Sequence, residues 1–390
     1  MFHKHGGDIY EYNEIRDFSA NINFRGMPES VERAAMAAVA RSVHYPDPEY
    51  RSLRRALAAR ENALLCQETD MAGAGAAKEP GTEGASLPGY PGGEVGPQHI
   101  ICGNGAAELM FALAAAYRPK QALLAAPSFF EYEQALASFG CGIRRFYMEK
   151  ESGFVLAEDF LDEIDEKTDI MILGNPNNPT GRLVETELLE KLLEICRERG
   201  ILLVLDESFF DFLSGEDGRR TFSGVRRIRE NPRLFVIKSF TKMYAMPGLR
   251  FGYGICSDTE LLEQMRRVVQ PWNVSVPAQA AAEAAAGELD FARETAGQTA
   301  VNRETMKRQM ERLGYRVFPS DTNFLLFQGP EDLEELCLRQ GVLIRDCSNF
   351  PGLEKGFFRI CIRGKEENNK LLKILEEAGG EEMQDTIKNR

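Results

Sequence analysis

Residues 234–252 decide the fold of this chain and read LFVIKSFTKMYAMPGLRFG. The apolar run at its start predicts a buried strand over residues 234–238. The tetrapeptide SFTK, which ends at Lys242, follows, and a glycine-containing loop then leads to Arg250. A lysine and an arginine after a strand can equally be an ordinary surface turn. The meaning of this segment therefore depends on the elements and motifs around it.

Short apolar strands alternate with amphipathic helices along the rest of the chain. Strands are expected at residues 100–102, 122–126, 143–148, 169–174, 201–205, 234–238 and 251–255, and helices at 106–117, 129–139 and 185–199. Continuous apolar strands separated by helices are typical of a mostly parallel sheet that is covered on both faces. The sequence therefore predicts an α/β fold with a mostly parallel seven-stranded sheet in its large domain.

The pattern divides the chain into three parts. Residues 45–272 are predicted to form the large domain, and residues 273–390 a smaller α+β domain. Residues 1–44, with a helix at 30–41, are expected to pack on the small domain as an arm. Residues 66–98 are rich in Gly, Ala, Glu and Pro and nearly devoid of large apolar side chains. They are expected to form a mobile surface insertion, because they bury too little to offset their ordering entropy.

The composition argues against several classes of protein. The 390 residues carry 47 Lys plus Arg against 60 Asp plus Glu, a net charge of −13, which argues against a nucleic-acid-binding surface. The apolar runs are far shorter than the roughly 20 residues that span a bilayer, so no membrane partner is expected. Eight scattered cysteines without a CxxC pair, and an N-terminus without an apolar signal core, indicate a cytoplasmic protein. The four histidines lack ligand spacing with any cysteine, so no metal site is expected.

Three further motifs lie at predicted strand ends. GNGAAE, residues 103–108, stands at a strand-to-helix junction, where backbone N–H groups and the helix dipole suit a phosphate. NPNNPTG, residues 175–181, follows another strand and could by itself be a plain loop. Asp206 ends an apolar run, where a carboxylate is costly without a charged or hydrogen-bonding partner. Each motif alone is a weak signal, but their order along the chain is specific.

In the order GNG, NPNNPTG, strand-ending aspartate, SxTK and arginine, the chain resembles the fold-type I, class I/II aminotransferase superfamily of pyridoxal 5′-phosphate (PLP) enzymes. The resemblance covers essentially the whole chain outside the insertion. It implies PLP as the cofactor and Lys242 and Asp206 as the catalytic residues. Lys242 would hold the cofactor covalently and later carry protons, which needs a depressed pKa. Asp206 would stand beside the ring nitrogen of PLP and keep it protonated.

The resemblance also implies the other cofactor-binding residues. The phosphate cup would consist of Gly105, Ala106, Ala107, Ser239, Thr241 and Arg250. Asn178 would donate to the 3′ oxygen of the cofactor. Phe129 would stack on the cofactor ring, although simple core packing is the plainer role for a phenylalanine there. Many members carry a tyrosine three residues after the aspartate, and Phe209 stands at that place here, so one hydrogen bond to the 3′ oxygen is lost.

The two ends of the chain narrow the resemblance. The stretches concerned are HGG at 5–7, DFSANIN at 17–23, YPD at 45–47, Phe209, and residues 344–353 and 358–363. Together they are similar to the threonine-phosphate decarboxylases of cobalamin biosynthesis, whose nearest relatives are histidinol-phosphate aminotransferases. The implied reaction is decarboxylation of L-threonine O-3-phosphate, a small phosphorylated amino acid, to (R)-1-amino-2-propanol O-2-phosphate.

The narrower resemblance also implies the substrate-binding residues. Arg359 would hold the substrate α-carboxylate in a charge-assisted pair, with Asn178 nearby. Arg345, His5 and Asn21 would line the phosphate end of the substrate. An N-terminal histidine can also be a solvated residue, and Arg345 could be an ordinary surface arginine.

Tyr45 would reach across a subunit interface to the PLP phosphate of a partner chain, so the resemblance implies a homodimer. Decarboxylation and transamination begin from the same adduct of cofactor and substrate and differ in which Cα bond is aligned for cleavage. The sequence does not show that angle, so a histidinol-phosphate or related class I/II aminotransferase is the alternative function. A PLP-binding regulatory module without catalysis is a second alternative, although the complete set of Lys242, Asp206 and Arg359 argues against it. The sequence does not distinguish threonine phosphate from serine phosphate.

Overall fold

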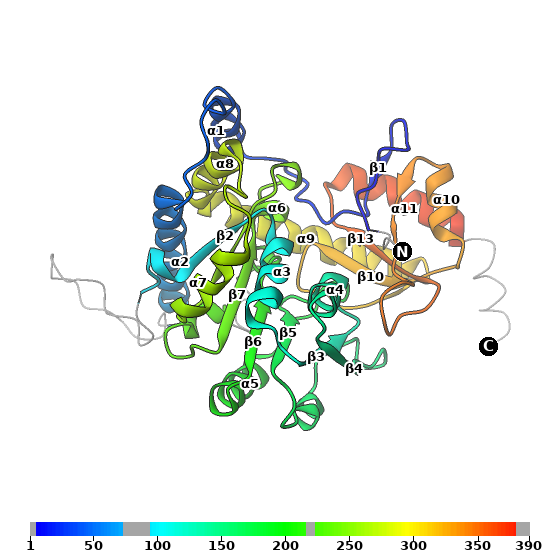
Figure 1. The fold of residues 1–390 in the computed structure, drawn as a ribbon. Coiled ribbons are helices and arrows are strands. Elements are labelled where there is room, and N and C mark those ends of the chain that lie inside the picture. Colours follow the sequence, from blue (N-terminus) through cyan, green and yellow to red (C-terminus); the bar gives the residue numbers. More distant parts are fainter. Residues whose placement is uncertain (1–4, 73–93, 216–222, 380–390) are drawn as a thin grey trace, which may run out of the picture.

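The computed structural model describes residues 5–72, 94–215 and 223–379. Seven strands form the larger sheet, in the order β2-β8-β7-β6-β5-β3-β4 (Figure 1). They are β2 (Ile100–Gly103), β3 (Gln121–Ala126), β4 (Gly142–Tyr147), β5 (Ile170–Gly174), β6 (Leu202–Asp206), β7 (Leu234–Ser239) and β8 (Gly252–Ile255). β8 runs antiparallel to β2 and β7, and the other neighbours run parallel. The predicted α/β fold with a mostly parallel seven-stranded sheet is confirmed.

Helices cover both faces of this sheet. One core includes side chains of α3 (Ala106–Tyr117), α4 (Phe130–Ser138) and α7 (Thr259–Val268), and the other includes side chains of α2 (Arg51–Ala72), α5 (Thr186–Arg199) and α8 (Val276–Ala286). β6 shows the alternation, because Leu202 and Val204 belong to the first core whereas Leu203 and Leu205 belong to the second. Burial on both faces explains why the strands are continuously apolar.

A smaller antiparallel sheet has the order β12-β13-β10-β9. Its strands are β9 (Arg316–Val317), β10 (Phe324–Gln328), β12 (Arg345–Asp346) and β13 (Phe357–Cys361), and the helices nearby are α9 (Leu289–Arg312), α10 (Leu333–Arg339) and α11 (Lys365–Gly379). A third core, with Phe18, Met306, Phe327 and Leu371 among its members, holds these elements together. The carboxyl ends of β5 to β7 and the strands β12 and β13 supply the side chains described below.

The N-terminal segment contacts both parts of the fold. β1 (Arg16–Asp17) pairs in parallel with β11 (Val342–Leu343), whereas α1 (Glu29–Val39) packs against α8. Of the expected insertion at residues 66–98, residues 73–93 lie outside the described residues. α2 continues to residue 72 and Val95 is buried, so regular or packed structure reaches into both ends of that segment. The division into an arm and two domains stays a prediction.

A buried cluster of charges fixes the ends of β6 and β7. Lys238 Nζ lies 3.0 Å from Glu207 Oε2 and 3.5 Å from Glu61 Oε2, and all three side chains are almost fully buried. Ser223 Oγ and the Gly224 N–H donate to Glu207 at 2.7 and 2.6 Å. Burial opposes the charged form of Lys238, but the charges of Glu61 and Glu207 raise its pKa above the ordinary value. Lys238 is therefore a charged structural residue.

The variant Lys238→Met tests this cluster. It leaves two carboxylates without their cation inside the protein, and breaking a buried pair in this way costs about 3–5 kcal/mol. Urea unfolding followed by circular dichroism should show that loss. The matched control is Arg339→Met, which removes an exposed pair with Glu335 on α10 and should cost at most about 0.5 kcal/mol. Equal losses in the two variants would contradict the structural role of Lys238.

Candidate active site

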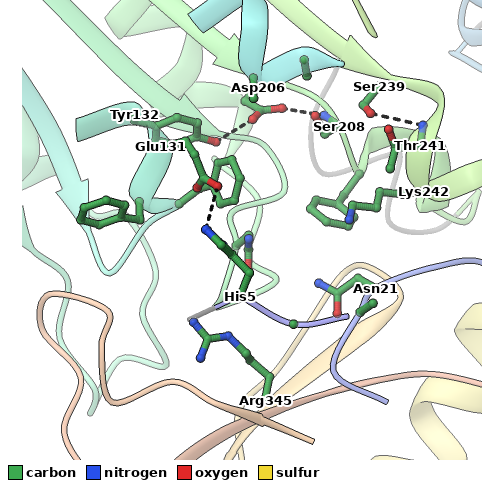
Figure 2. Close-up of a pocket in the computed structure, with 18 of the residues that line it drawn as sticks. His5, Asn21, Glu131, Tyr132, Asp206, Ser208, Ser239, Thr241, Lys242 and Arg345 are labelled. Carbon is green, nitrogen blue, oxygen red and sulfur yellow. Dashed lines mark hydrogen bonds and ion pairs between the residues drawn. The ribbon is translucent and has the colours of Figure 1, made fainter. Parts of the chain in front are cut away.

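One pocket opens at the edge of the larger sheet where β5, β6 and β7 end, the edge at which α/β sheets bind ligands (Figure 2). All but two of the predicted site residues line it: His5, Asn21, Ala106, Ala107, Phe129, Asn178, Asp206, Ser239, Thr241, Lys242, Arg250, Arg345 and Arg359. Gly105 adjoins the pocket beneath Arg250, and Tyr45 lies outside it. Residues that are far apart in the sequence thus come together as the motif order predicted.

Asp206 ends β6 and is held by two hydrogen bonds. The Ser208 N–H donates to Oδ1 at 2.9 Å, and the Tyr132 hydroxyl donates to Oδ2 at 2.8 Å. Burial raises the pKa of Asp206, whereas these two donors and the charge of Lys242 lower it. Burial also raises the pKa of Tyr132, so its hydroxyl keeps the proton that it donates. The carboxylate is therefore fixed in one orientation at the pocket wall.

Lys242 lies in α6 (Phe240–Met243), which begins directly where β7 ends. Ser239 caps this short helix, because its hydroxyl accepts from the Thr241 N–H at 3.3 Å. Burial, with the charge of Arg359 second, lowers the pKa of the Lys242 ammonium to about 8. The amine is thus far more often neutral near pH 8 than a surface lysine, which is the state a nucleophilic amine needs.

The N-terminus of α3 is a candidate site for an anion. No side chain caps this helix, so its first N–H groups, at Ala106 and Ala107, face the pocket. Gly105 has a φ of 82°, and a Cβ there would lie 2.5 Å from Arg250 Nη2. A Cβ on Gly252 would lie 2.5 Å from the Ala106 nitrogen. The two glycines let the arginine and the helix start approach closely enough to share one phosphate.

The loop after β5 carries Asn178 to the pocket. Asn177 anchors this loop, because its amide donates to the Pro127 carbonyl and to Thr180 Oγ1, both at 2.9 Å. The Asn178 side-chain oxygen accepts from Arg359 Nη1. Arg359 Nη2 also donates to the Ser19 carbonyl at 2.9 Å. One arginine therefore links β13, the β5 loop and the N-terminal segment.

Arg345 and Arg359 face each other across two antiparallel strands. Their Cα atoms are direct partners in the register of β12 and β13, so both side chains lie on the same face of the smaller sheet. Both are almost fully buried and both line the pocket. Burial lowers the pKa of Arg359 to about 10, with a further lowering from the charge of Arg345. Two buried like charges directly opposite each other are unfavourable unless anions bind between or beside them.

The N-terminal segment places His5 at the mouth of the pocket. A Cβ on Gly6 would clash with the Ser19 carbonyl, and the Gly7 N–H donates to Ser19 Oγ at 2.7 Å. Ser19 in turn donates to Asp17 Oδ1 at 2.6 Å. The two glycines of HGG thus let this segment lie flat against residues 17–20, which points His5 inward.

Sequence reasoning missed Glu131, Tyr132 and Ser208, all of which line the pocket. Tyr132 stands three residues after Phe129, one helical turn away, and their rings meet edge to face at 5.6 Å. Ser208 follows Asp206 by two residues, the spacing at which an aspartate accepts from the backbone. Local spacing could therefore have found these two, whereas the contact of Glu131 with His5 depends on the fold.

Phe209 and Tyr45 lie in different surroundings. Phe209 lines the pocket and packs edge-on against Phe324 at 5.1 Å. Tyr45 is 77% exposed and stacks on Trp272, which is itself 45% exposed, with ring centroids 4.4 Å apart. Within its own chain, Tyr45 therefore does not reach the pocket that Lys242 lines.

Two further observations apply only to the described residues. Among them, no helix is both long and apolar enough to cross a membrane. No cluster of His, Cys, Asp or Glu side chains in the same residues has the arrangement of a metal site.

Comparison with known proteins identifies the family. The model of the class I and II aminotransferases matches residues 17–375. The chain belongs to this family. Family members use PLP, so the chain is a PLP-dependent enzyme.

Two relatives of this aminotransferase-family chain have names that state a reaction or a pathway. A threonine-phosphate decarboxylase from Salmonella typhimurium is 34% identical over an aligned length of 389 residues, and the alignment covers 95% of each chain. An adenosylcobalamin biosynthesis bifunctional protein from Leptospira interrogans is 28% identical over 95% of this chain and 40% of its own length.

Two solved structures share the fold of this aminotransferase-family chain. The histidinol-phosphate aminotransferase of Clostridium acetobutylicum has a TM-score of 0.76 at 27% identity, covering 93% of this chain and 98% of that one. The L-threonine-O-3-phosphate decarboxylase of Porphyromonas gingivalis has a TM-score of 0.73 at 26% identity, covering 92% and 98%.

The pocket of this aminotransferase-family chain fits PLP. The uncapped α3 terminus and Arg250 suit the phosphate, Asp206 suits a protonated ring nitrogen, and the Lys242 amine suits the aldehyde. Arg359 Nε and Asn21 Oδ1 are buried without a hydrogen-bond partner among the described residues. Such buried polar atoms are costly unless a ligand pairs with them.

Covalent labelling tests which lysine meets the cofactor. Borohydride reduction of the PLP-loaded protein, followed by peptide mapping, should place the label on Lys242, because its lowered pKa makes it the neutral amine of the pocket. Lys238 is the internal control, since its two carboxylate partners keep it charged. A label on Lys238 would contradict the assignment.

Proposed function

We propose that this chain decarboxylates L-threonine O-3-phosphate to (R)-1-amino-2-propanol O-2-phosphate, with PLP as its cofactor, in cobalamin biosynthesis. The observation that carries the proposal is the cross-strand pair Arg345 and Arg359, which offers a buried cation to each of two anionic groups. A substrate with a carboxylate and a phosphate fits this pair. The names of the Salmonella and Porphyromonas relatives support the same substrate.

Arg359 is the residue we assign to the α-carboxylate. Its Nη atoms already bind Asn178 and the Ser19 carbonyl, so the guanidinium is fixed in place. Its buried Nε has no partner among the described residues and remains to donate to an incoming carboxylate oxygen. A charge-assisted hydrogen bond of this kind contributes about 1.5–3 kcal/mol.

The cofactor end of the pocket supplies the chemistry. Bound PLP acts as an electron sink for the electron pair of a broken Cα bond. Asp206, held by Tyr132 and Ser208, would keep a proton on the ring nitrogen of bound PLP. Lys242 would hold the cofactor aldehyde until the substrate amine replaces it, and the released side chain, once protonated, would supply the proton that takes the place of CO₂ on Cα. Asn178 and Phe129 would hold the 3′ oxygen and the ring face.

The choice between losing CO₂ and losing the α-proton depends on which Cα bond stands perpendicular to the cofactor plane. Arg359 sets that angle, because it decides where the carboxylate is held. An aminotransferase that acts on histidinol phosphate is the second candidate, favoured by the likeness to the Clostridium structure. It differs in needing a keto acid as amino-group acceptor.

The enzyme is proposed to be a cytoplasmic homodimer with two shared sites. The stacked rings of Tyr45 and Trp272 form an apolar surface that is exposed to solvent in a single chain and that a second subunit could cover. Tyr45 would then complete the PLP phosphate site of the partner. Such an arrangement makes each site depend on both subunits.

Replacement of the two arginines tests the substrate. The wild type should release CO₂ from threonine phosphate without a keto acid. Arg345→Ala should raise KM for threonine phosphate roughly ten- to a hundred-fold, because it removes a charge-assisted bond to phosphate, and should leave the spectrum of bound PLP unchanged. Arg359→Ala should impair threonine phosphate and unphosphorylated threonine alike, since both carry an α-carboxylate.

Unphosphorylated threonine is the control substrate for both variants. Equal weakening of the two substrates by Arg345→Ala would show that Arg345 does not bind phosphate. Keto-acid-dependent amino transfer without CO₂ release would favour the aminotransferase.

Mixing two inactive variants tests the shared site. Tyr45→Ala lacks the partner contribution and Lys242→Ala lacks the amine, so each homodimer should be impaired. A mixed dimer contains one site with an intact Lys242 and an intact Tyr45, because the two residues come from different chains. Activity that reappears after the variants are unfolded and refolded together confirms the arrangement, and a fully active monomer in sedimentation experiments would refute it.

A further inference from the structure

Glu131 is a pocket carboxylate to which the proposed function gives no role. It lies in the first turn of α4 and points into the pocket, where Oε1 is 3.6 Å from His5 Nε2 (Figure 2). Its other oxygen, Oε2, is buried and has no hydrogen-bond partner among the described residues. A buried carboxylate oxygen without a donor is unfavourable when the group is ionised.

Charged groups from four segments surround this carboxylate. They are His5 of the N-terminal segment, Lys242 of α6, Asp206 of β6 and Arg345 of β12. Burial raises the pKa of Glu131 to about 7, its own backbone N–H and Lys242 oppose the rise, and Asp206 adds to it. Glu131 can therefore exist in either protonation state near neutral pH.

The position of Glu131 conflicts with a dianionic ligand. Figure 2 shows the carboxylate directed at His5, with Arg345 beyond the same histidine, so Glu131 borders the end of the pocket assigned to the substrate phosphate. An ionised carboxylate there repels a phosphate dianion, whereas a protonated one donates a hydrogen bond to it.

We infer that Glu131 is a specificity-determining residue that takes up a proton from solvent when the phosphorylated substrate binds and then donates a hydrogen bond to its phosphate. This inference rests on the proposed function, because it needs the phosphate at the Arg345 end. Protonation of Glu131 removes the negative charge that opposes the phosphate, so that the positive charge of Arg345 acts on the dianion without that repulsion. A ligand without phosphate gains nothing from the proton, so only phosphorylated ligands should couple their binding to the protonation of Glu131.

The pH dependence follows from the raised pKa. Below about pH 7 Glu131 is already protonated and binding needs no proton. Above that pH the free enzyme holds an ionised Glu131, so binding must draw in a proton and weakens. If protonation is obligatory, the dissociation constant rises roughly tenfold for each pH unit above about 7.

Calorimetry on the PLP-loaded enzyme measures this proton directly. The probe is isopropyl phosphate, which has the phosphate and a short carbon chain but no amine, so it cannot react with the cofactor. Titrations at pH 8 in buffers of different ionisation enthalpy should show uptake of about one proton by the wild type. Glu131→Gln should abolish most of the uptake and bind the probe more tightly than the wild type at pH 8.5.

His5→Gln is the matched control, because His5 is the other group at this end that could gain a proton. It should still take up a proton, although it binds the probe more weakly. Uptake that is lost in His5→Gln and kept in Glu131→Gln would overturn the inference, as would weaker binding by Glu131→Gln at every pH. With threonine phosphate as substrate, Glu131→Gln should flatten the rise of KM above pH 7.

The same titrations separate this inference from the proposed function. If isopropyl phosphate binds the wild type and Arg345→Ala equally, or binds neither, then the assignment of the substrate phosphate to the Arg345 end of the pocket is wrong. If binding needs Arg345 but no proton depends on Glu131, the phosphate end stands and only the role of Glu131 is refuted.

Discussion

A carboxylate buried at the end of a parallel strand is the constraint on which the pocket depends. Burial favours the neutral form of Asp206, whereas the Ser208 N–H, the Tyr132 hydroxyl and the positive charge of a protonated Lys242 favour the ionised form that its proposed role needs. Each of those groups is positioned by a different element, respectively the loop after β6, α4 and α6. The parallel sheet therefore does more than bury apolar surface, since it brings the ends of three strands to one edge where these elements begin.

The opposite wall of the pocket buries positive charge, whereas the wall with Asp206 buries a carboxylate. Two arginines in register on β12 and β13 would repel each other in an ordinary sheet, and their burial makes the repulsion stronger. The proposed substrate has two anionic groups that would remove this cost, so binding energy and specificity would arise from the same feature. Glu131 is the only pocket carboxylate besides Asp206 among the described lining residues, and burial raises its pKa to about 7, which reduces the negative charge near this wall at neutral pH.

Much of this arrangement could be predicted from the sequence, because strand ends and their motifs are local features. Lys242, Asp206 and Asn178 each follow an apolar strand, and a parallel sheet brings such positions together without further information. The opposition of Arg345 and Arg359 depends on a strand register that spacing alone does not reveal. The contact between Glu131 and His5 joins residues 126 positions apart in the chain and depends on how the N-terminal segment folds over the pocket. Helical order in residues 66–72 is not evident from composition, because the average over residues 66–98 hides the continuation of the helix that precedes them.

If Arg359 holds the substrate carboxylate as proposed, the decision between decarboxylation and transamination depends on the N-terminal segment as much as on the cofactor end. Arg359 can select one Cα bond only if its guanidinium cannot rotate, and two of its nitrogens are held by Asn178 and by the Ser19 carbonyl. Ser19 is fixed in turn through Asp17 and Gly7, which belong to the same segment that carries His5. Loosening this segment would free the carboxylate to tilt while every group around the ring nitrogen stayed in place. On this proposal, a fold shared with aminotransferases directs a different bond cleavage through contacts that lie outside the cofactor-binding motifs.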